Sequence, residues 1–464
     1  MKLLILGVCG TFMGGLALIA RALGHEVRGC DAGVYPPMST LLEREGIEVL
    51  GGYREDHLRP APDLVLCGNV LSRGNPCVEY VLDHGIPYTS GPQWLAETVL
   101  RERYVLAVSG THGKTTTASL LAYLLEAAGQ APGFLIGGVP RDFGVSARLG
   151  SGTAFVVEAD EYDTAFFDKR SKFVHYRPLG LIITNVEFDH GDIFPDFDAI
   201  KRQFHHLIRT VPGRGLIVRP IPDPVVDEVL AMGLWCPVIT FGEGEESDWR
   251  CRAVCPDHSA FEVFFQGQDL GTVAWSQAGA HNARNALCAL AMARHFGIAP
   301  SASITALNRF RGVKRRLERL AVVSGVTVYD DFAHHPTEIA ATLSALHRQA
   351  GRNVEIKGAR VIAVFEPRSN TMRLGLYAGA LADAFRDADL IFLYSPPDLS
   401  WDIASETKVL GTRRSVFGDI AEIVMRVADL VRPGDQVVVM SNGGFGGIQE
   451  RLIAALGSGS SISG

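Results

Sequence analysis

A short polar stretch, GTHGKTT from Gly110 to Thr116, has the residue types that hold a triphosphate. Its glycines allow the backbone to wrap an anion, the Lys114 ammonium can reach the phosphate that is transferred, and the Thr115 hydroxyl can lie beside Mg²⁺. The stretch departs from the usual G-x-x-x-x-G-K-[ST] pattern, because Val108 stands where the first glycine belongs. An apolar run precedes it and an amphipathic helical run follows, so we interpret it as a phosphate loop rather than a capped turn.

Carboxylates and amides follow two later apolar runs. Glu158, Asp160 and Glu161 end one run, and the stretch NVEFDH from Asn185 to His190 ends the next. Ligands of open parallel sheets lie at the carboxyl ends of the strands, and Mg²⁺ prefers oxygen ligands. These residues therefore predict a metal site beside the phosphate loop, with an acidic, solvated rim of loops as the alternative.

A second glycine-rich turn, GVCGTFMGG, begins at Gly7. It fails the dinucleotide pattern G-x-G-x-x-G, because Cys9 and Phe12 stand at positions that require glycine. Asp31 ends the second apolar run at a distance that suits a ribose hydroxyl. A nucleotide diphosphate can lie at such a helix N terminus, but the pattern does not distinguish NAD from a nucleotide sugar, and a turn without ligand is the alternative.

Short apolar runs alternate with amphipathic helical stretches along the whole chain, and the alternation restarts near Lys2, Arg103 and Val326. This order is typical of α/β domains built on mostly parallel sheets. The sequence therefore predicts three α/β domains: a Rossmann-like domain in residues 1–102, a central P-loop ATPase domain in residues 103–320 and a Rossmann-like domain in residues 321–464.

Within the middle domain, strands are predicted at 103–110, 154–160 and 179–186. The β-like sequence between Val218 and Gly271 predicts a side sheet or hairpin. The final GSGSSISG predicts a disordered tail.

The composition excludes several classes of protein. With 44 basic and 51 acidic residues, the 464-residue chain carries a net charge of −7 and offers no basic field for nucleic acid. No apolar run reaches the roughly 20 residues of a membrane span, and no small-residue cleavage site follows the N-terminal run, so we expect no signal peptide. The eight cysteines are scattered, which predicts reduced thiols and a cytoplasmic protein. A zinc site at Cys251, Cys255 and His258 lacks a fourth ligand.

Six blocks, in order, resemble the Mur ligase family, the ATP-dependent amide-forming enzymes of peptidoglycan synthesis. The family's phosphate loop is a shortened G-x-x-G-K-T-T, which matches the departure noted above. The resemblance covers nearly the whole chain, and it rests on GTHGKTTT, EADEYD, TNVEFDH, HNARNALCAL, FRGVKRR and YDDFAHHPTE.

The resemblance implies ATP and Mg²⁺ as cofactors, with Mn²⁺ able to substitute, and an acyl phosphate formed on the lactyl carboxylate of UDP-N-acetylmuramate. The blocks GVCGTFMGGLA, FDKRSKFVHYRP, FEPRSNTMR and SNGGFGG are similar to the branch that attaches the tripeptide L-alanyl-γ-D-glutamyl-meso-diaminopimelate in murein recycling. The branch that attaches L-alanine is the alternative, and a folylpolyglutamate synthetase is a more distant one. The first turn disfavours the folylpolyglutamate synthetase. A non-catalytic nucleotide-binding regulator would keep Lys114 but should have lost the acidic metal groups, whereas Glu158 and His190 are present. A NAD-dependent dehydrogenase is a further alternative, which would be excluded if UDP-N-acetylmuramate binds and NAD does not. The sequence carries no signal for the number of chains in an assembly.

The resemblance also implies roles for single residues. Catalytic roles fall on Lys114, Glu158, His190 and Arg316, and metal ligation on Thr115, Glu158 and His190. ATP would contact Gly110, Thr111, His112, Gly113, Lys114, Thr115, Thr116, Asn282, Asn285, Arg316 and Asp331. The UDP-sugar would contact Gly7, Cys9, Gly10, Thr11, Phe12, Met13, Gly14, Asp31 and Asn69. The peptide would contact His335, Arg368 and Arg373.

Several of these assignments have ordinary structural alternatives. His190 could orient Glu158, the two asparagines could be polar surface, and the two peptide arginines could be surface residues. The charged residues Lys169, Arg170 and Lys172 could form either a solvated loop or the edge of a substrate-binding site. Because water would destroy an acyl phosphate, we also expect the third domain to close after ATP and sugar bind.

Overall fold

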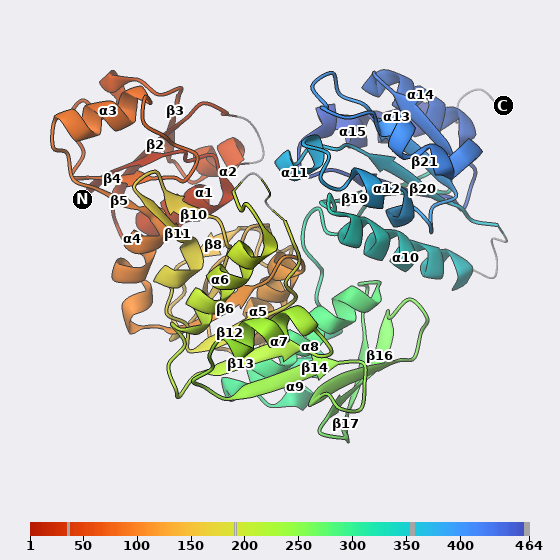
Figure 1. Cartoon of the computed structure of the whole chain (residues 1–464), viewed down its shortest axis with the longest axis horizontal. Helices are drawn as coiled ribbons and strands as arrows, with labels where there is room; N and C mark the ends of the chain where they lie inside the picture. Colours follow the sequence, from red (N-terminus) through yellow and green to blue (C-terminus); the bar gives the residue numbers. More distant parts are fainter. Residues whose placement is uncertain (35–37, 190, 192, 353–357, 459–464) are drawn as a thin grey trace.

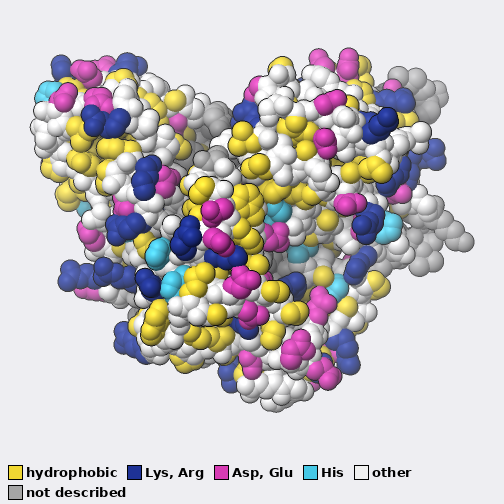
Figure 2. Space-filling model, viewed as in Figure 1, with side chains coloured by type: hydrophobic (Ala, Val, Ile, Leu, Met, Phe, Trp, Pro, Cys, Tyr) yellow, Lys and Arg dark blue, Asp and Glu magenta, His cyan; other side chains and the backbone are white. Residues whose placement is uncertain are grey.

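The structure is a computed structural model that describes residues 1–34, 38–189, 191, 193–352 and 358–458. It contains three α/β domains, each with its own sheet (Figure 1). The first and third domains lie on the same side of the middle domain, with a hollow in the surface between them (Figure 2). Among the described residues no helix is both long and apolar enough to cross a membrane.

The first domain has a fully parallel sheet in the order β3-β2-β1-β4-β5. Side chains alternate along its central strand, so Leu3 and Ile5 pack against α1 and α4, whereas Leu4 and Leu6 pack on the side of α3. The elements are β1 (Lys2–Leu6), α1 (Thr11–Ala22), β2 (Glu26–Asp31), α2 (Met38–Arg44), β3 (Glu48–Gly51), η1 (Glu55–Leu58), β4 (Leu64–Cys67), α3 (Pro76–Asp83), β5 (Tyr88–Ser90), α4 (Gly91–Thr98) and η2 (Leu100–Glu102).

The middle domain has a ten-stranded sheet in the order β17-β16-β15-β14-β13-β12-β6-β9-β7-β8. Its core strands are parallel, and β6 lies between β12 and β9. The elements are β6 (Tyr104–Ser109), α5 (Lys114–Ala127), β7 (Gly133–Leu135), β8 (Ala147–Arg148), β9 (Ala154–Glu158), β10 (Asp163–Ala165), β11 (Asp168–Ser171), η3 (Lys172–His175), β12 (Gly180–Ile183), α6 (Phe197–Ile208), β13 (Leu216–Pro220), α7 (Pro224–Ala231), β14 (Val238–Gly242), β15 (Trp249–Ala253), β16 (Ala260–Phe265), β17 (Gln268–Ala274), α8 (Ala280–His295) and α9 (Pro300–Leu307).

The third domain has a six-stranded sheet in the order β18-β19-β23-β20-β21-β22, in which only β18 is antiparallel to its neighbour. The predicted join at 320/321 falls within β18. The elements are β18 (Glu318–Val323), β19 (Val326–Asp331), α10 (Pro336–Arg352), β20 (Val361–Phe365), α11 (Asn370–Arg373), α12 (Ala378–Ala384), β21 (Leu390–Tyr394), α13 (Ile403–Glu406), η4 (Lys408–Arg413), β22 (Arg414–Phe417), α14 (Ile420–Leu430), β23 (Gln436–Met440), η5 (Phe445–Gly447) and α15 (Ile448–Ser458).

The predicted strands of the middle domain are present, each slightly shorter than its apolar run, as β6, β9 and β12. The side sheet expected between Val218 and Gly271 corresponds to the antiparallel extension β15–β16–β17. The hairpin β10–β11 was not predicted, because its sequence DTAFFDKRS lacks an apolar alternation. Of the predicted C-terminal tail, residues 459–464 lie outside the described residues.

Candidate active site

The turn between β6 and α5 needs glycine at two positions. Gly110 has φ of +134°, and a Cβ there would lie 2.1 Å from the Thr184 hydroxyl oxygen. Gly113 has φ of +79°, and a Cβ there would lie 2.6 Å from the Asn285 Oδ1 atom. Both values of φ lie in the region that favours glycine. The turn is therefore held tightly between the end of β12 and helix α8, and its main chain forms the N terminus of α5.

Lys114 is buried and surrounded by oxygen atoms. Its ammonium donates to the carbonyl oxygens of Gly110 (2.7 Å) and Thr111 (3.3 Å). It also lies 3.3 Å from a Glu161 carboxylate oxygen and 3.6 Å from one of Asp160. Burial alone would lower the pKa of Lys114, but these carboxylates outweigh it and hold the pKa above its usual value. Lys114 is thus a fixed positive charge at the first turn of α5.

Thr115 and Glu158 form a second polar pair beside the lysine. The Thr115 hydroxyl donates to Glu158 Oε1 at 2.8 Å, and the Gly137 main-chain N–H donates to Glu158 Oε2 at 2.6 Å. Burial and the charge of Asp160 raise the pKa of Glu158, and Lys114 opposes the shift. The hydroxyl and carboxylate are hard oxygen donors of the kind that Mg²⁺ takes.

The third domain reaches this pair through the segment that precedes β18. Arg316 Nη2 donates to the Thr115 hydroxyl at 3.2 Å, and its Nη1 lies 3.7 Å from Glu338 Oε1. Asp331, at the end of β19, accepts from the main-chain N–H groups of Leu317 (2.6 Å) and Ala333 (2.7 Å). Burial raises the pKa of Asp331 to about 6. Asp331 therefore braces the linker that carries Arg316.

His112 lies inside the phosphate loop and joins the two domains. Its Nδ1 is 3.3 Å from Glu338 Oε1 of the third domain, and its Nε2 is 3.5 Å from Glu187 Oε2 of the middle domain. Burial alone would lower the pKa of His112, but the two carboxylates outweigh it and raise the pKa to about 9. The Thr337 hydroxyl also donates to Glu187 at 2.7 Å. Below pH 9 a charged imidazole thus connects the phosphate loop to α10.

His335 lies beside this contact, with its ring centroid 4.4 Å from that of His112. Burial and the charge of His112 lower the pKa of His335 to about 4, so the ring is neutral at pH 7. Its Nδ1 accepts from the Thr337 main-chain N–H at 3.2 Å. His335 therefore lies at the contact between the middle and third domains, next to the phosphate loop.

Asn282 and Asn285, predicted on one face of a helix, lie in the first turns of α8 and are buried. Asn282 donates to the Ala278 carbonyl oxygen at 2.7 Å. The Asn285 amide faces Gly113 of the phosphate loop. Their burial argues against polar surface residues and places one of them against the loop.

Two groups of potential metal ligands occur among the described residues. In the first, His112, Glu187 and His335 bring their ligand atoms within 4.8 Å of one another, and the ion pairs above already occupy His112 and Glu187. His190, predicted as a metal ligand, lies outside the described residues. Among the predicted metal ligands that the structure describes, Thr115 and Glu158 lie together.

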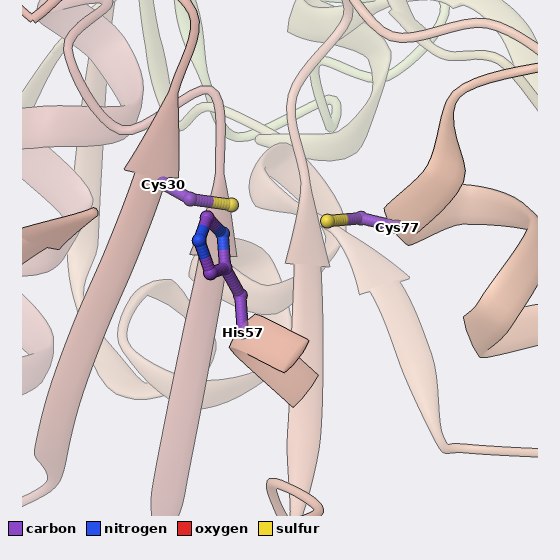
Figure 3. Close-up of side chains that lie close together, drawn as sticks. All are labelled: Cys30, His57 and Cys77. Atoms are coloured by element: carbon purple, nitrogen blue, oxygen red, sulfur yellow. The ribbon is translucent and has the colours of Figure 1, made fainter. Parts of the chain in front are cut away.

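The second group consists of Cys30, His57 and Cys77, whose side chains converge in the core of the first domain (Figure 3). The Cys77 thiol donates to the Arg54 carbonyl oxygen at 3.3 Å. The hydrogen bond between the two thiols raises the pKa of Cys30 and lowers the pKa of Cys77. Because both thiols are fully buried in the apolar core of the first domain, we assign them to core packing. All eight cysteines are free, as predicted.

The glycine turn of the first domain has a simpler arrangement. Gly7 has φ of +81°, and Gly10 caps α1 without a side-chain hydrogen bond. The Asp31 carboxylate accepts from the main-chain N–H groups of Cys9 and Gly33, both at 2.9 Å. Burial and the charge of Asp31 raise the pKa of Cys9 to about 11. The predicted contact residues Thr11, Phe12, Met13 and Gly14 form the start of α1, and Asn69 follows β4.

The two arginines predicted to bind peptide differ in their surroundings. Arg368 follows β20, is exposed, and packs its side chain over the Gly443 backbone. Arg373 ends α11 and pairs with Asp398. Among the described residues only Arg373 of these two has an ion-pair partner.

Three family models match the chain in sequence order. The Mur ligase family, catalytic domain matches residues 2–103, the Mur ligase middle domain matches 108–293, and the Mur ligase, glutamate ligase domain matches 315–443. The chain belongs to the Mur ligase family. It is an ATP-dependent ligase, as members of this family are. The predicted family and the predicted three-domain α/β fold are confirmed.

Several relatives of this Mur ligase cover nearly its whole length. The UDP-N-acetylmuramate–L-alanyl-γ-D-glutamyl-meso-2,6-diaminoheptandioate ligase of Escherichia coli is 53% identical over 456 residues, or 98% of both chains. The Haemophilus influenzae enzyme of the same name is 49% identical over 97% of this chain and 98% of its own. A crystal structure of a murein peptide ligase from Psychrobacter arcticus superposes with a TM-score of 0.75 at 44% identity, covering 98% of this chain and 99% of that one.

Several side chains at this site were not predicted from the sequence. Glu338 and Thr337 at the start of α10 contact His112 and Glu187 of the middle domain. Tyr377 donates to the Phe188 carbonyl oxygen at 2.6 Å across the same contact. These residues lie more than 140 positions from their partners, so no local spacing could indicate the contacts.

Proposed function

We propose that this Mur ligase joins the tripeptide L-alanyl-γ-D-glutamyl-meso-diaminopimelate to UDP-N-acetylmuramate at the expense of ATP, in cytoplasmic murein recycling. The relatives whose names state this reaction are 53% and 49% identical and match the chain almost from end to end. Relatives named as UDP-N-acetylmuramate–L-alanine ligases are 33% to 34% identical over similar lengths. The identity thus favours the tripeptide over L-alanine as the second substrate.

The observation that carries the proposal is the arrangement of Lys114, Thr115 and Glu158 at the β6 and β9 strand ends, with Arg316 of the third domain against Thr115. Transfer of a phosphoryl group to a carboxylate brings two anions together, so the site must supply positive charge where they meet. In this proposal Lys114 and Arg316 hold the γ-phosphate from two domains.

Thr115 and Glu158 fit a magnesium ion, because both present oxygen atoms at the N terminus of α5. By its resemblance to the family motif we also assign His190, which lies outside the described residues, to this ion. Bound there, Mg²⁺ would neutralise charge on the β- and γ-phosphates, and Mn²⁺ would substitute for it. The phosphates would lie along Gly110–Thr116 and the adenine near Asn282 and Asn285.

The other substrates would occupy the first and third domains. The UDP-sugar diphosphate would lie at the N terminus of α1, where Gly10 leaves main-chain N–H groups open, and the Asp31 carboxylate would receive the ribose. The peptide would lie along the third domain, with Arg368, Arg373 and His335 toward its carboxylates and amine. The lactyl carboxylate would take the γ-phosphoryl group, and the peptide α-amine would then displace phosphate from the acyl carbon.

The third domain would have to move for this cycle. Its contacts with the middle domain, through Arg316, Glu338 and Thr337, close over the phosphate loop. The sequence predicts domain joins near 102/103 and 320/321, and we keep the first. Because 320/321 falls within β18 and the third family model begins at residue 315, we propose that the segment just before residue 315 is the hinge. Small-angle scattering with and without an ATP analogue and UDP-N-acetylmuramate tests the movement, and an unchanged radius of gyration contradicts it.

The reaction is tested by ADP release with ATP, Mg²⁺ and UDP-N-acetylmuramate, and with either the tripeptide or L-alanine as the second substrate. The proposal expects release with the tripeptide and little with L-alanine. Release that depends on L-alanine alone would assign the other branch of the family. Omission of UDP-N-acetylmuramate controls for simple ATP hydrolysis.

A further inference from the structure

Lys172 lies where the middle domain meets the glycine turn of the first domain. It begins η3, directly after the hairpin β10–β11, and is only 7% exposed. Its ammonium lies 5.0 Å from the centre of the Phe12 ring, at the start of α1, and 5.5 Å from the centre of the Tyr162 ring. The lysine is thus a buried cation of the middle domain held against the turn of the first domain.

The hairpin that precedes Lys172 is anchored on the first domain. Phe167 at its tip contacts Tyr88 of β5 with ring centroids 5.1 Å apart, and Phe166 stacks on the same ring at 6.3 Å. The main-chain N–H of Lys172 donates to the Tyr162 carbonyl oxygen at 2.9 Å. These contacts fix the position of the ammonium between the two domains.

The carboxylates nearest to Lys172 are already matched by other cations. Asp160 and Glu161 lie 3.6 Å and 3.3 Å from the Lys114 ammonium, and Asp163 pairs with Lys169 at 2.6 Å. Among the described residues the Lys172 ammonium itself makes no hydrogen bond and no ion pair. Burial lowers the pKa of Lys172, and the charges of Asp160, Asp163 and Glu161 oppose the shift.

An ammonium on a largely buried side chain loses part of its hydration, and the two aromatic faces compensate only part of that loss. An anion that enters between the first and middle domains would supply the missing partner. Within the proposed function three anionic groups come near this place: the γ-phosphate of ATP, which Lys114 and Arg316 already hold, and the diphosphate and lactyl carboxylate of the nucleotide sugar. The diphosphate has donors of its own in the open main-chain N–H groups at the start of α1.

The carboxylate fits the lysine better, because Asp160 and Glu161 act on both Lys172 and Lys114, so that a group on Lys172 lies on the side of the phosphate loop. We propose that Lys172 binds the lactyl carboxylate of UDP-N-acetylmuramate and holds it facing the γ-phosphate on Lys114. This inference rests on the proposed function and adds to it a substrate-binding residue. One carboxylate oxygen contacts Lys172, while the other attacks the γ-phosphorus, the bond to the β–γ bridging oxygen breaks, and ADP leaves. No proton moves in this step.

The test compares Lys172→Met with Lys169→Met, which removes an exposed lysine of the same hairpin. For Lys172→Met we expect the KM for UDP-N-acetylmuramate to rise about 10- to 100-fold, the range for loss of a hydrogen bond to a charged group. The KM for ATP should stay unchanged. Inhibition by UDP-N-acetylglucosamine, which has the diphosphate but no lactyl carboxylate, should also stay unchanged. Lys172→Arg should restore part of the affinity, and Lys169→Met should behave as the parent enzyme.

Two results would overturn the inference. Equal weakening of UDP-N-acetylglucosamine and UDP-N-acetylmuramate would show that the lysine contacts the diphosphate. Unchanged constants for both nucleotide sugars would show that it only packs against Phe12. If Lys172→Met does not fold, Lys172→Gln and Lys172→Arg give the same comparison of the two nucleotide sugars. A parent enzyme that releases no ADP with UDP-N-acetylmuramate and tripeptide would instead refute the proposed function.

Discussion

The molecule contains two turns of the same construction, in which a buried parallel strand leads through glycines into a helix. The turn after β6 is surrounded by charged side chains, with Lys114 inside it and Arg316 of the third domain above it. The turn after β1 carries no basic side chain, and among the described residues Asp31 is the one carboxylate hydrogen-bonded to its main chain. The backbone of either turn can bind an oxyanion. Within the proposed function the turn after β6 takes the phosphate that is transferred and the turn after β1 only holds a diphosphate, and only the former has a basic side chain within its own segment.

Lys114→Ala should have the largest effect, because it removes the cation from the transferring turn. We expect kcat to fall on the order of 10³-fold, as it does in other enzymes when a group that stabilises the charge of the transition state is removed. ADP release in the complete assay measures it. The variant should still bind UDP-N-acetylmuramate in titration calorimetry. Such binding would show that the substitution affects the reaction and leaves the turn of the first domain intact. Turnover near that of the parent enzyme would contradict the assignment of the phosphate loop.

Alanine at a glycine of each turn sharpens the comparison. At Gly110, with φ of +134°, the new Cβ would lie 2.1 Å from the Thr184 hydroxyl oxygen, so the phosphate loop must move. At Gly10 the nearest atom would be the Gly7 carbonyl oxygen at 3.5 Å, an ordinary contact. We expect Gly110→Ala to lower kcat/KM for ATP about 100-fold, because small displacements of reacting groups cost that much. Gly10→Ala should change kcat/KM for ATP less than about threefold, because the residue lies in the other turn.

The two turns also differ in how far the sequence alone identified them. The strand, glycines, lysine and helix of the middle domain are contiguous, so their chemistry could be predicted from Gly110 to Thr116. The acids at Glu158 and Asp160 could be placed beside them because parallel strands end at one edge of a sheet. Glu338, Thr337 and Tyr377 could not be predicted, since their partners come from another domain. The position of Lys172 against Phe12 likewise depends on how two domains pack.

Asp31→Ala tests whether the first turn is organised by its single carboxylate. Without it, the N–H groups of Cys9 and Gly33 lose their acceptor, and the ribose loses its proposed partner. We expect the KM for UDP-N-acetylmuramate to rise about 10-fold, at the lower end for a hydrogen bond to a charged group. The KM for ATP should not change, since the residue lies in the other turn. Equal effects on both substrates would instead indicate a general loss of folding.

The smallest expected effect is a change of thermal stability with pH, and it concerns only the turn of the middle domain. Glu338 and Glu187 raise the pKa of His112 to about 9 in the folded protein, above the 6.5 of a free imidazole. The charged ring therefore stabilises the folded state fully below pH 6.5, and this contribution is lost as the pH rises through 9.

His112→Gln should lower the unfolding temperature by a few degrees at pH 6.5, and the difference from the parent enzyme should shrink toward pH 9.5. Differential scanning calorimetry at both pH values measures it, with His84→Gln, an exposed histidine of the first domain, as the matched control. A difference that stays constant with pH would mean that the imidazole acts by packing and not by charge. Among its described residues the turn after β1 has no histidine and no ion pair to the third domain. If His112 acts by packing, the difference in charge between the two turns would therefore come from Lys114 and Arg316 alone.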